Sequence, residues 1–180
     1  MRIAARRLAG AFEIALEPKA DERGDFTRWY DREAFARAGL PTDWVQANES
    51  TSRRGVVRGL HFQRPPHAET KLVRAVAGAV FDVFVDLRRG SATYGEWDAV
   101  ELSRERRNAV LVPRGFAHGF CALTEEAVVS YLVDCAYAPG AEGGLAWDDP
   151  RLAIPWPLAG PAIVSAKDRA WPRLEALEPL

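Results

Sequence analysis

A run of short strand-like segments between Trp44 and Tyr137 constrains the fold of this chain more than any other feature. Stretches rich in Val, Phe and Leu follow one another there, separated by Gly, Pro and charged turns, with no helical period of apolar residues between them. Closely spaced strands without intervening helices are typical of β-sandwiches and jelly-roll barrels. We therefore expect a mainly β protein, a jelly-roll β-barrel with short peripheral helices.

The segments on either side of this run are expected to add only minor elements. Gly and Pro punctuate them, and their apolar patterns are too short for long helices. The expected elements are strands at Ala11–Leu16 and Phe26–Tyr30, a turn at Asp21–Asp25, a short helix at Asp31–Ala38, and an irregular wrap at Ala141–Leu180 that ends in a short helix.

Composition narrows the class of protein. The chain has 180 residues, 48% of them hydrophobic and 27% charged, and its net charge is −1. These values predict one domain spanning residues 1–180, with no basic surface for nucleic acid and no apolar stretch near the roughly 20 residues that cross a bilayer. Basic residues near Met1 precede no apolar segment, so we expect no signal peptide and a cytoplasmic location. Cys121 and Cys135 are expected to be reduced, buried thiols.

The segment Gly55–Gln63 carries one of only three histidines, and Lys71–Arg74 follows soon after it. Apolar and polar side chains alternate here, as on strands with one solvated or ligand-lined face. Arg58, His61 and Lys71 are therefore expected to project from neighbouring strands into one cavity. A titratable base beside fixed cations suits removal of a proton from an anionic substrate and stabilisation of the resulting oxyanion.

Several ordered motifs resemble those of the dTDP-4-dehydrorhamnose 3,5-epimerase family, from about Asp21 to Asp168. The motifs are Gln46–Ser50, Val57–His61, Lys71–Arg74, Pro113–Phe120 and Trp147–Pro150. The resemblance implies a jelly-roll barrel of the cupin type, no cofactor, and a homodimer that exchanges its N-terminal strands. It also implies a substrate that is a nucleotide-linked 4-keto-6-deoxyhexose, whose C3 and C5 protons flank the C4 ketone and leave to give enolates.

The resemblance assigns roles by position. His61 would be the base, and Asp168 would pair with its imidazole. Tyr131 would be the acid on the opposite face of the sugar. Lys71 would lie near the C4 oxygen and stabilise its developing charge, while His118 would hold the sugar and polarise the ketone.

The remaining assigned positions bind the nucleotide part of the substrate. Arg58 would contact the diphosphate, a natural partner for a guanidinium, and Tyr137 would stack on the nucleobase. The resemblance implies further substrate contacts at Arg23, Gln46, Asn48, Glu142 and Lys167.

Two positions depart from the family pattern. Arg28 stands where a glutamate often reaches the base, and a guanidinium can donate to cytosine N3 but cannot accept from thymine N3–H. This predicts weaker discrimination of dTDP from CDP sugars; the alternative is that the position tolerates change without touching the base. The second departure is Glu69-Thr70, just before Lys71, where glutamine or glycine is common.

Other functions remain open at this level. His118 follows Pro113-x-Gly115, which resembles the second motif of metal-binding cupins, but only one histidine stands at His61, so we expect no metal. A mono-epimerase acting at C3 or C5 alone, possibly on a CDP-sugar, would keep His61, Tyr131 and Asp168. A non-catalytic nucleotide-sugar-binding cupin is the alternative from another class.

Overall fold

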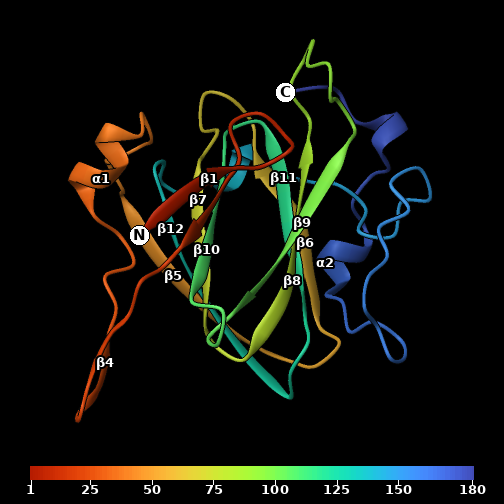
Figure 1. Cartoon of the computed structure of the whole chain (residues 1–180). Coiled ribbons are helices and arrows are strands. Elements are labelled where there is room, and N and C mark those ends of the chain that lie inside the picture. The colour runs from red at the N-terminus through yellow and green to blue at the C-terminus, as the bar shows by residue number, and fades with distance from the viewer.

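Two antiparallel β-sheets face one another in the computed structural model, which describes residues 1–180 (Figure 1). The six-stranded sheet has the order β1 (Arg2–Ala5), β2 (Phe12–Ala15), β10 (Asn108–Val112), β7 (Lys71–Ala77), β12 (Glu126–Val133), β5 (Gln46–Arg53). The five-stranded sheet has the order β13 (Glu142–Gly144), β6 (Val57–Gln63), β11 (Phe116–Ala122), β8 (Ala79–Asp86), β9 (Trp97–Ser103). From β5 to β8 and from β9 to β13, successive strands alternate between the sheets, which is the jelly-roll arrangement expected from the sequence.

The core between the sheets follows from strand alternation. In β7 the side chains of Val73 and Ala75 are buried in a cluster with Phe84 and Phe120 of the facing sheet, whereas Arg74 between them points outward. Successive side chains of a strand point to opposite faces, so each buried residue is followed by one that faces away from the core. The same alternation decides which polar side chains point between the sheets.

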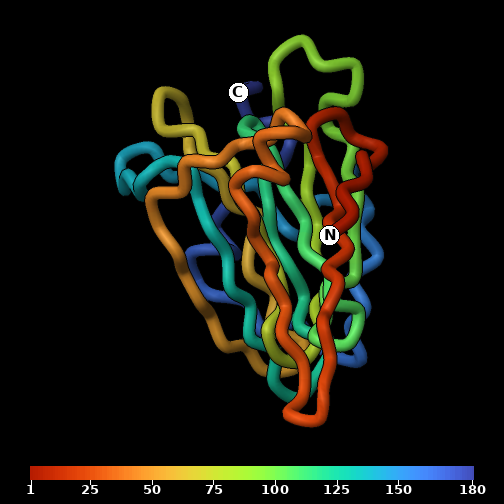
Figure 2. Tube along the Cα trace, turned by 60° about the vertical axis from the view of Figure 1, so that its left-hand side comes forward, coloured from red at the N-terminus to blue at the C-terminus, as the bar shows by residue number.

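The N-terminal part holds a hairpin and a helix on the side of the six-stranded sheet. The strands β3 (Lys19–Asp21) and β4 (Gly24–Phe26) pair only with each other and extend away from the barrel (Figure 1). Helix α1 (Arg32–Arg37) begins after Asp31, whose side chain accepts a hydrogen bond from the Ala34 N–H. The red N-terminal strands run along the same side of the barrel (Figure 2).

One expected strand is wrong. The segment Phe26–Tyr30 was expected to be a strand, but β4 ends at Phe26 and residues 27–31 join no sheet. The Trp29 ring instead packs on the Arg74 guanidinium, whose Cζ lies 4.6 Å from the ring centroid. The Tyr30 ring packs against Phe35 of α1. Aromatic residues favoured a strand locally, but their packing partners lie in the sheet and the helix.

The C-terminal wrap covers the outer face of the five-stranded sheet, on the side opposite α1 (Figure 1). Leu145, Leu152 and Leu174 are buried there against Phe62 and Val85. The wrap is irregular, as expected, apart from a 3-10 turn at Pro139–Ala141, strand β13, helix α2 (Ala166–Arg169) and a last 3-10 turn at Leu174–Ala176.

Two smaller points complete the fold. Both cysteines are free thiols; Cys121 is buried, whereas Cys135 is only partly so, which corrects the expectation that both are buried. Burial raises the pKa of the Cys121 thiol to about 11. None of the helices has the length and apolar character needed to cross a bilayer.

Candidate active site

The two sheets enclose a hollow of about 170 Å³ that contains five of the side chains singled out by the sequence. Arg58 and His61 come from β6 and His118 from β11, all in the five-stranded sheet, whereas Lys71 and Tyr131 come from β7 and β12 of the six-stranded sheet. The shared cavity was expected, but the expectation of neighbouring strands was wrong, because β6 and β7 belong to facing sheets. We call this cavity the inner hollow.

An irregularity in β6 brings both Arg58 and His61 into the inner hollow. Residues three apart on a regular strand face opposite sides, but the pairing of β6 with β11 shifts register between His118 and Phe120. Gly59 lies in this stretch with φ +132, and a Cβ there would stand 2.6 Å from the Gly119 Cα. Only glycine fits both the backbone conformation and the close approach of the two strands.

His61 is held by a buried carboxylate from the C-terminal wrap. Its Nε2 lies 2.7 Å from Asp168 Oδ1, and the other Asp168 oxygen accepts from the Gly59 N–H at 3.2 Å. The Trp171 indole donates to Asp168 Oδ1 at 3.3 Å. Burial favours the neutral acid, but the His61 hydrogen bond and charge and the Gly59 N–H outweigh it, so the pKa of Asp168 lies below its ordinary value. The carboxylate therefore fixes the orientation of the His61 ring.

His118 has a similar partner that the sequence analysis missed. Its Nε2 lies 2.9 and 3.0 Å from the two oxygens of Asp82, which is fully buried in β8. Burial raises the pKa of Asp82, while the nearby His118 and Lys71 oppose the rise. The available signal was a carboxylate inside the apolar strand Val80–Val85, since a buried acid needs a partner.

Lys71 and Tyr131 lie on the opposite wall from His61. The Lys71 ammonium pairs with Glu69 at 3.2 Å. The sequence showed Glu69 as a departure from the family pattern but did not predict this ion pair. The pKa of Tyr131 lies above its ordinary value. Burial is the main cause and the negative charge of Glu69 the second, while the positive charge of Arg58 opposes them. Its hydroxyl therefore stays protonated at neutral pH, as a proton donor requires.

A second hollow of about 580 Å³ adjoins the first and shares Arg58 and His61 with it. Lys167 and Asp168 of α2 line its other side. The Arg58 guanidinium is fixed by Ser52 Oγ at 2.9 Å and by the Thr51 carbonyl at 3.0 Å. Two cationic side chains at this opening suit a phosphate-bearing group that extends from the inner hollow.

Four further expected residues form a network at the rim. The Gln46 side chain accepts from the Tyr137 N–H at 2.6 Å, the Tyr137 hydroxyl donates to Glu142 at 3.0 Å, and Lys167 pairs with Glu142 at 2.7 Å. The hydrogen bond to Glu142 raises the pKa of Tyr137. The Tyr137 side chain is exposed, which leaves a ring face for stacking. Asn48 lies opposite Tyr131 in the pairing of β5 with β12.

Arg23 and Arg28 are not brought to either hollow within one chain. Arg23 is at the tip of the projecting hairpin and pairs with Asp21, and Arg28 pairs with Asp31 at 3.2 Å with an exposed side chain. The reason is topological, because the hairpin extends away from its own barrel (Figure 1). Within a single chain, the Arg28 side chain therefore does not point into the site, as contact with the nucleobase would require.

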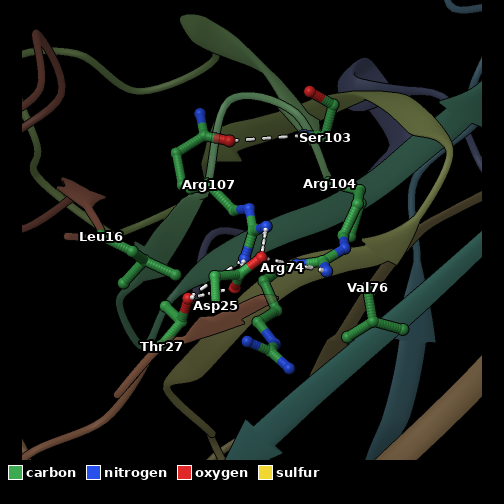
Figure 3. Close-up of a pocket in the computed structure, with 10 residues that line it drawn as sticks. Leu16, Asp25, Thr27, Arg74, Val76, Ser103, Arg104 and Arg107 are labelled. Carbon is green, nitrogen blue, oxygen red and sulfur yellow. Dashed lines mark hydrogen bonds and ion pairs between the residues drawn. The ribbon is translucent and has the colours of Figure 1, made fainter. Parts of the chain in front are cut away.

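A third hollow, of about 220 Å³, lies on the outer face of the six-stranded sheet (Figure 3). His61 is not among its lining residues. Arg74, Arg104 and Arg107 line it together with Asp25, which pairs with Arg107 at 2.5 Å. The hollow includes none of the residues expected to act on substrate.

No group of three or more His, Cys, Asp or Glu side chains is placed to hold a metal ion. His61 and His118 each use Nε2 to bind a carboxylate. The absence of a metal requirement stays a prediction.

The arrangement defines what chemistry the inner hollow can perform. A carboxylate-bound imidazole on one wall faces a protonated phenol on the other, and an ammonium lies beside the phenol. Such a site can remove a proton from one face of a carbon acid, stabilise the enolate oxygen and return a proton to the other face.

Comparisons with known proteins agree with this chemistry. The family model for dTDP-4-dehydrorhamnose 3,5-epimerase matches residues 5–176. The chain is 49% identical to the dTDP-4-dehydrorhamnose 3,5-epimerase of Methanothermobacter thermautotrophicus, over 91% of this chain and 89% of that protein. It is 46% identical to the dTDP-4-dehydrorhamnose 3-epimerase of Streptomyces niveus, over 94% of this chain and 82% of that protein.

A solved structure of an epimerase also closely resembles this chain. The dTDP-6-deoxy-D-glucose-3,5-epimerase of Legionella pneumophila, crystallised with dTDP-4-keto-L-rhamnose, superposes with a TM-score of 0.94 at 38% identity, covering 98% of this chain and 94% of that one. The cupin-type jelly-roll fold expected from the resemblance is thereby confirmed. The chain belongs to the dTDP-4-dehydrorhamnose 3,5-epimerase family.

Proposed function

We propose that this protein converts dTDP-4-dehydro-6-deoxyglucose to dTDP-4-dehydrorhamnose by inverting C3 and C5 through enolate intermediates. The observation that carries the proposal is the placement of His61, bound to Asp168, and Tyr131 on opposite walls of one hollow. Inversion needs a base and an acid on opposite faces of the same carbon. Family membership and the Legionella relative, whose structure contains dTDP-4-keto-L-rhamnose, support the identity of the sugar.

The mechanism uses the two walls in turn. His61 takes the proton from the carbon beside the ketone, and Asp168 stabilises the resulting imidazolium. The electron pair moves to the C4 oxygen, where the Lys71 ammonium and His118 stabilise the enolate. Tyr131 then delivers a proton to the opposite face of the same carbon, and the ketone re-forms.

The nucleotide part binds toward the rim in this proposal. Arg58, fixed by Ser52, holds the diphosphate, and Tyr137 stacks on the base. Gln46, Asn48, Glu142 and Lys167 supply further substrate contacts that the family resemblance implies. No cofactor takes part, because the substrate's own ketone makes the C3 and C5 protons acidic.

Replacing His61 by Ala tests the proposal. We expect turnover of dTDP-4-dehydro-6-deoxyglucose to fall by about 10²- to 10⁴-fold, the usual contribution of a general base, while dTDP still binds in calorimetry. The matched control is His67→Ala, which removes an exposed histidine outside both hollows. Wild-type turnover by the His61 variant would contradict the mechanism.

A second candidate is epimerisation at C3 alone. The Streptomyces niveus relative, 46% identical, is a 3-epimerase, whereas the relatives from Methanothermobacter thermautotrophicus and Legionella pneumophila are 3,5-epimerases. His61, Tyr131 and Asp168 serve either reaction, because the number of carbons inverted depends on how the sugar turns in the hollow. A non-catalytic binding protein is disfavoured, since both the base and the acid are present.

The active form in this proposal is a homodimer. The β3–β4 hairpin pairs with no other strand, and Phe26 at its end is 65% exposed. An isolated two-stranded hairpin is only marginally stable in water, so a second copy that covers it would stabilise both. Arg23 and Arg28 would then reach the partner's nucleotide, and weaker selection of dTDP over CDP stays a prediction that depends on that contact. Two free thiols support a cytoplasmic location.

A further inference from the structure

Glu69 places a carboxylate directly beside the group expected to stabilise the enolate. Its Oε1 lies 3.2 Å from the Lys71 Nζ, and the side chains of both residues are only 12% exposed. Shielding from water strengthens the interaction between two charges at this distance. The ion pair is therefore shielded from solvent, and its Lys71 end lines the inner hollow.

The carboxylate of Glu69 is fixed by a buried amide. Gln63 Nε2 donates to Glu69 Oε2 at 3.1 Å and to the His67 carbonyl at 3.1 Å, while Gln63 Oε1 accepts from the Ala138 N–H at 2.6 Å. Gln63 itself is 3% exposed. Because this amide is bonded at both ends, Glu69 cannot swing away and Lys71 is held at the wall of the hollow.

The same carboxylate lies close enough to act on Tyr131. Lys71 pairs with Val133, and Tyr131 pairs with Val73, in the register of β7 and β12. Lys71 and Tyr131 are thus diagonal neighbours on the inner face of the sheet, a spacing of roughly 7–8 Å or less. The charge of Glu69 contributes to the raised pKa of Tyr131, second to burial.

We propose that Glu69 is a positioning residue that sets the charge at the Lys71 wall of the inner hollow: it holds Lys71 beside Tyr131 and partly cancels the positive field that stabilises the enolate. The inference rests on the proposed function, since it concerns the same enolate. Its consequence is a slower carbon-acid step together with an acid that keeps its proton to higher pH.

Other charged or titratable groups that line the inner hollow also face Tyr131 and contribute to the field there. Arg58 and His61 face it from β6, Lys71 from its neighbouring strand β7, and His118 from β11. His118 is bound to Asp82 and His61 to Asp168, so each imidazole carries its own carboxylate. Glu69 is the remaining acid, and it is the one paired with an ammonium that must also serve the substrate.

The test is Glu69→Gln, which keeps the shape and an acceptor for Lys71 but removes the charge. Deuterium uptake from solvent into dTDP-4-dehydro-6-deoxyglucose is followed by proton NMR across the pH range. We expect uptake about threefold to thirtyfold faster at neutral pH, because the Lys71 field is no longer opposed. We also expect the alkaline limb of the rate of epimer formation, read in the same spectra, to move down by roughly half a unit to one unit. Inversion needs the Tyr131 proton, and a tyrosinate forms more easily without the nearby carboxylate.

Two further variants make the result specific. Glu69→Asp keeps the charge and should leave the alkaline limb in place. Glu125→Gln removes a carboxylate whose side chain is 89% exposed and should change neither rate nor profile. Uptake by Glu69→Gln at the wild-type rate or slower, or an unmoved alkaline limb, overturns the inference. Absence of uptake in the wild-type protein is a different result, because it contradicts the proposed function itself.

Discussion

Tyr131 is the residue whose role separates two steps of the mechanism. Without its hydroxyl, His61 can still take a proton and return it to the same face of the sugar, so exchange continues while inversion stops. We expect Tyr131→Phe to incorporate deuterium at least about tenfold faster than it forms epimer, measured by proton NMR in deuterium oxide.

A control distinguishes loss of the acid from loss of packing. Tyr94→Phe removes a hydroxyl that lies 3.4 Å from the Leu177 carbonyl, outside both hollows. It should leave the ratio of exchange to inversion unchanged. Equal loss of exchange and inversion in Tyr131→Phe would assign the tyrosine to packing or to polarisation of the ketone.

The sequence predicted some site residues and missed others for a physical reason. His61 and Lys71 stand in motifs that indicate the chemistry, and the family resemblance assigned Tyr131 by position, so their presence in one hollow could be anticipated. Asp82 and Glu69 act through partners on other elements, His118 on β11 and Lys71 on β7. Such pairs are set by strand register and by the packing of loops, which a single sequence does not display.

At the level of elements, Asp86 at the end of β8 organises the loop that leads to β9. Its buried carboxylate accepts from the Arg88 guanidinium at 2.7 and 2.9 Å and from Ser91 and Thr93 at 2.6 Å each. Burial would raise its pKa, but these donors together outweigh burial and hold the pKa of Asp86 well below its ordinary value. The carboxylate form is therefore strongly preferred in the folded protein.

We expect Asp86→Asn to lower the free energy of unfolding at pH 7 by about 2–4 kcal/mol, since donors around a buried charge lose their partner. A depressed folded pKa adds stability that is present above the unfolded pKa of about 3.9 and is lost as pH falls toward the folded value. Urea unfolding should therefore give the same difference at pH 7 and pH 5 and a smaller one at pH 3.

The matched control is Asp148→Asn, which changes an exposed carboxylate in the C-terminal wrap. It should cost less than about 0.5 kcal/mol at every pH. A difference for Asp86→Asn that stayed constant down to pH 3 would show that packing, rather than charge, accounts for its effect.

The elements themselves were predictable where the pattern was strong. Alternating or apolar runs identified β7, β8 and β12, and the short helix expected at Asp31–Ala38, before Gly39 and Pro41, is α1. Strand β13 was missed because its sequence is Glu142-Gly143-Gly144, which has no strand-forming side chains. Its glycines are needed for contact, since a Cβ at Gly144 would stand 2.3 Å from the Trp171 ring.

At the scale of the molecule, the unpaired β3–β4 hairpin is the feature that a single chain leaves unexplained. We expect a homodimer of the 19.9 kDa chain in sedimentation equilibrium at micromolar concentration. Phe26→Asp places a charge on an exposed aromatic residue of the hairpin and should shift the protein toward monomer by at least about tenfold in dissociation constant.

Ala159→Asp adds the same charge to an exposed position of the C-terminal wrap, on the opposite side of the barrel. It should leave the association unchanged. A monomeric wild type, or a Phe26 variant that associates as tightly as wild type, would contradict exchange of the hairpin.

The layered fold was predictable from strand spacing, but the assignment of β6 and β7 to facing sheets was not, because it depends on contacts far apart in the sequence.

Whether this site forms enolates at both carbons is decided by the position of deuterium after wild-type protein acts on dTDP-4-dehydro-6-deoxyglucose in deuterium oxide. Proton NMR reads C3 and C5 separately. We expect loss of both proton signals together with appearance of the epimer inverted at both carbons. Deuterium at C3 alone would assign the protein to the 3-epimerases, and no deuterium at either carbon would contradict the central claim that this site forms an enolate.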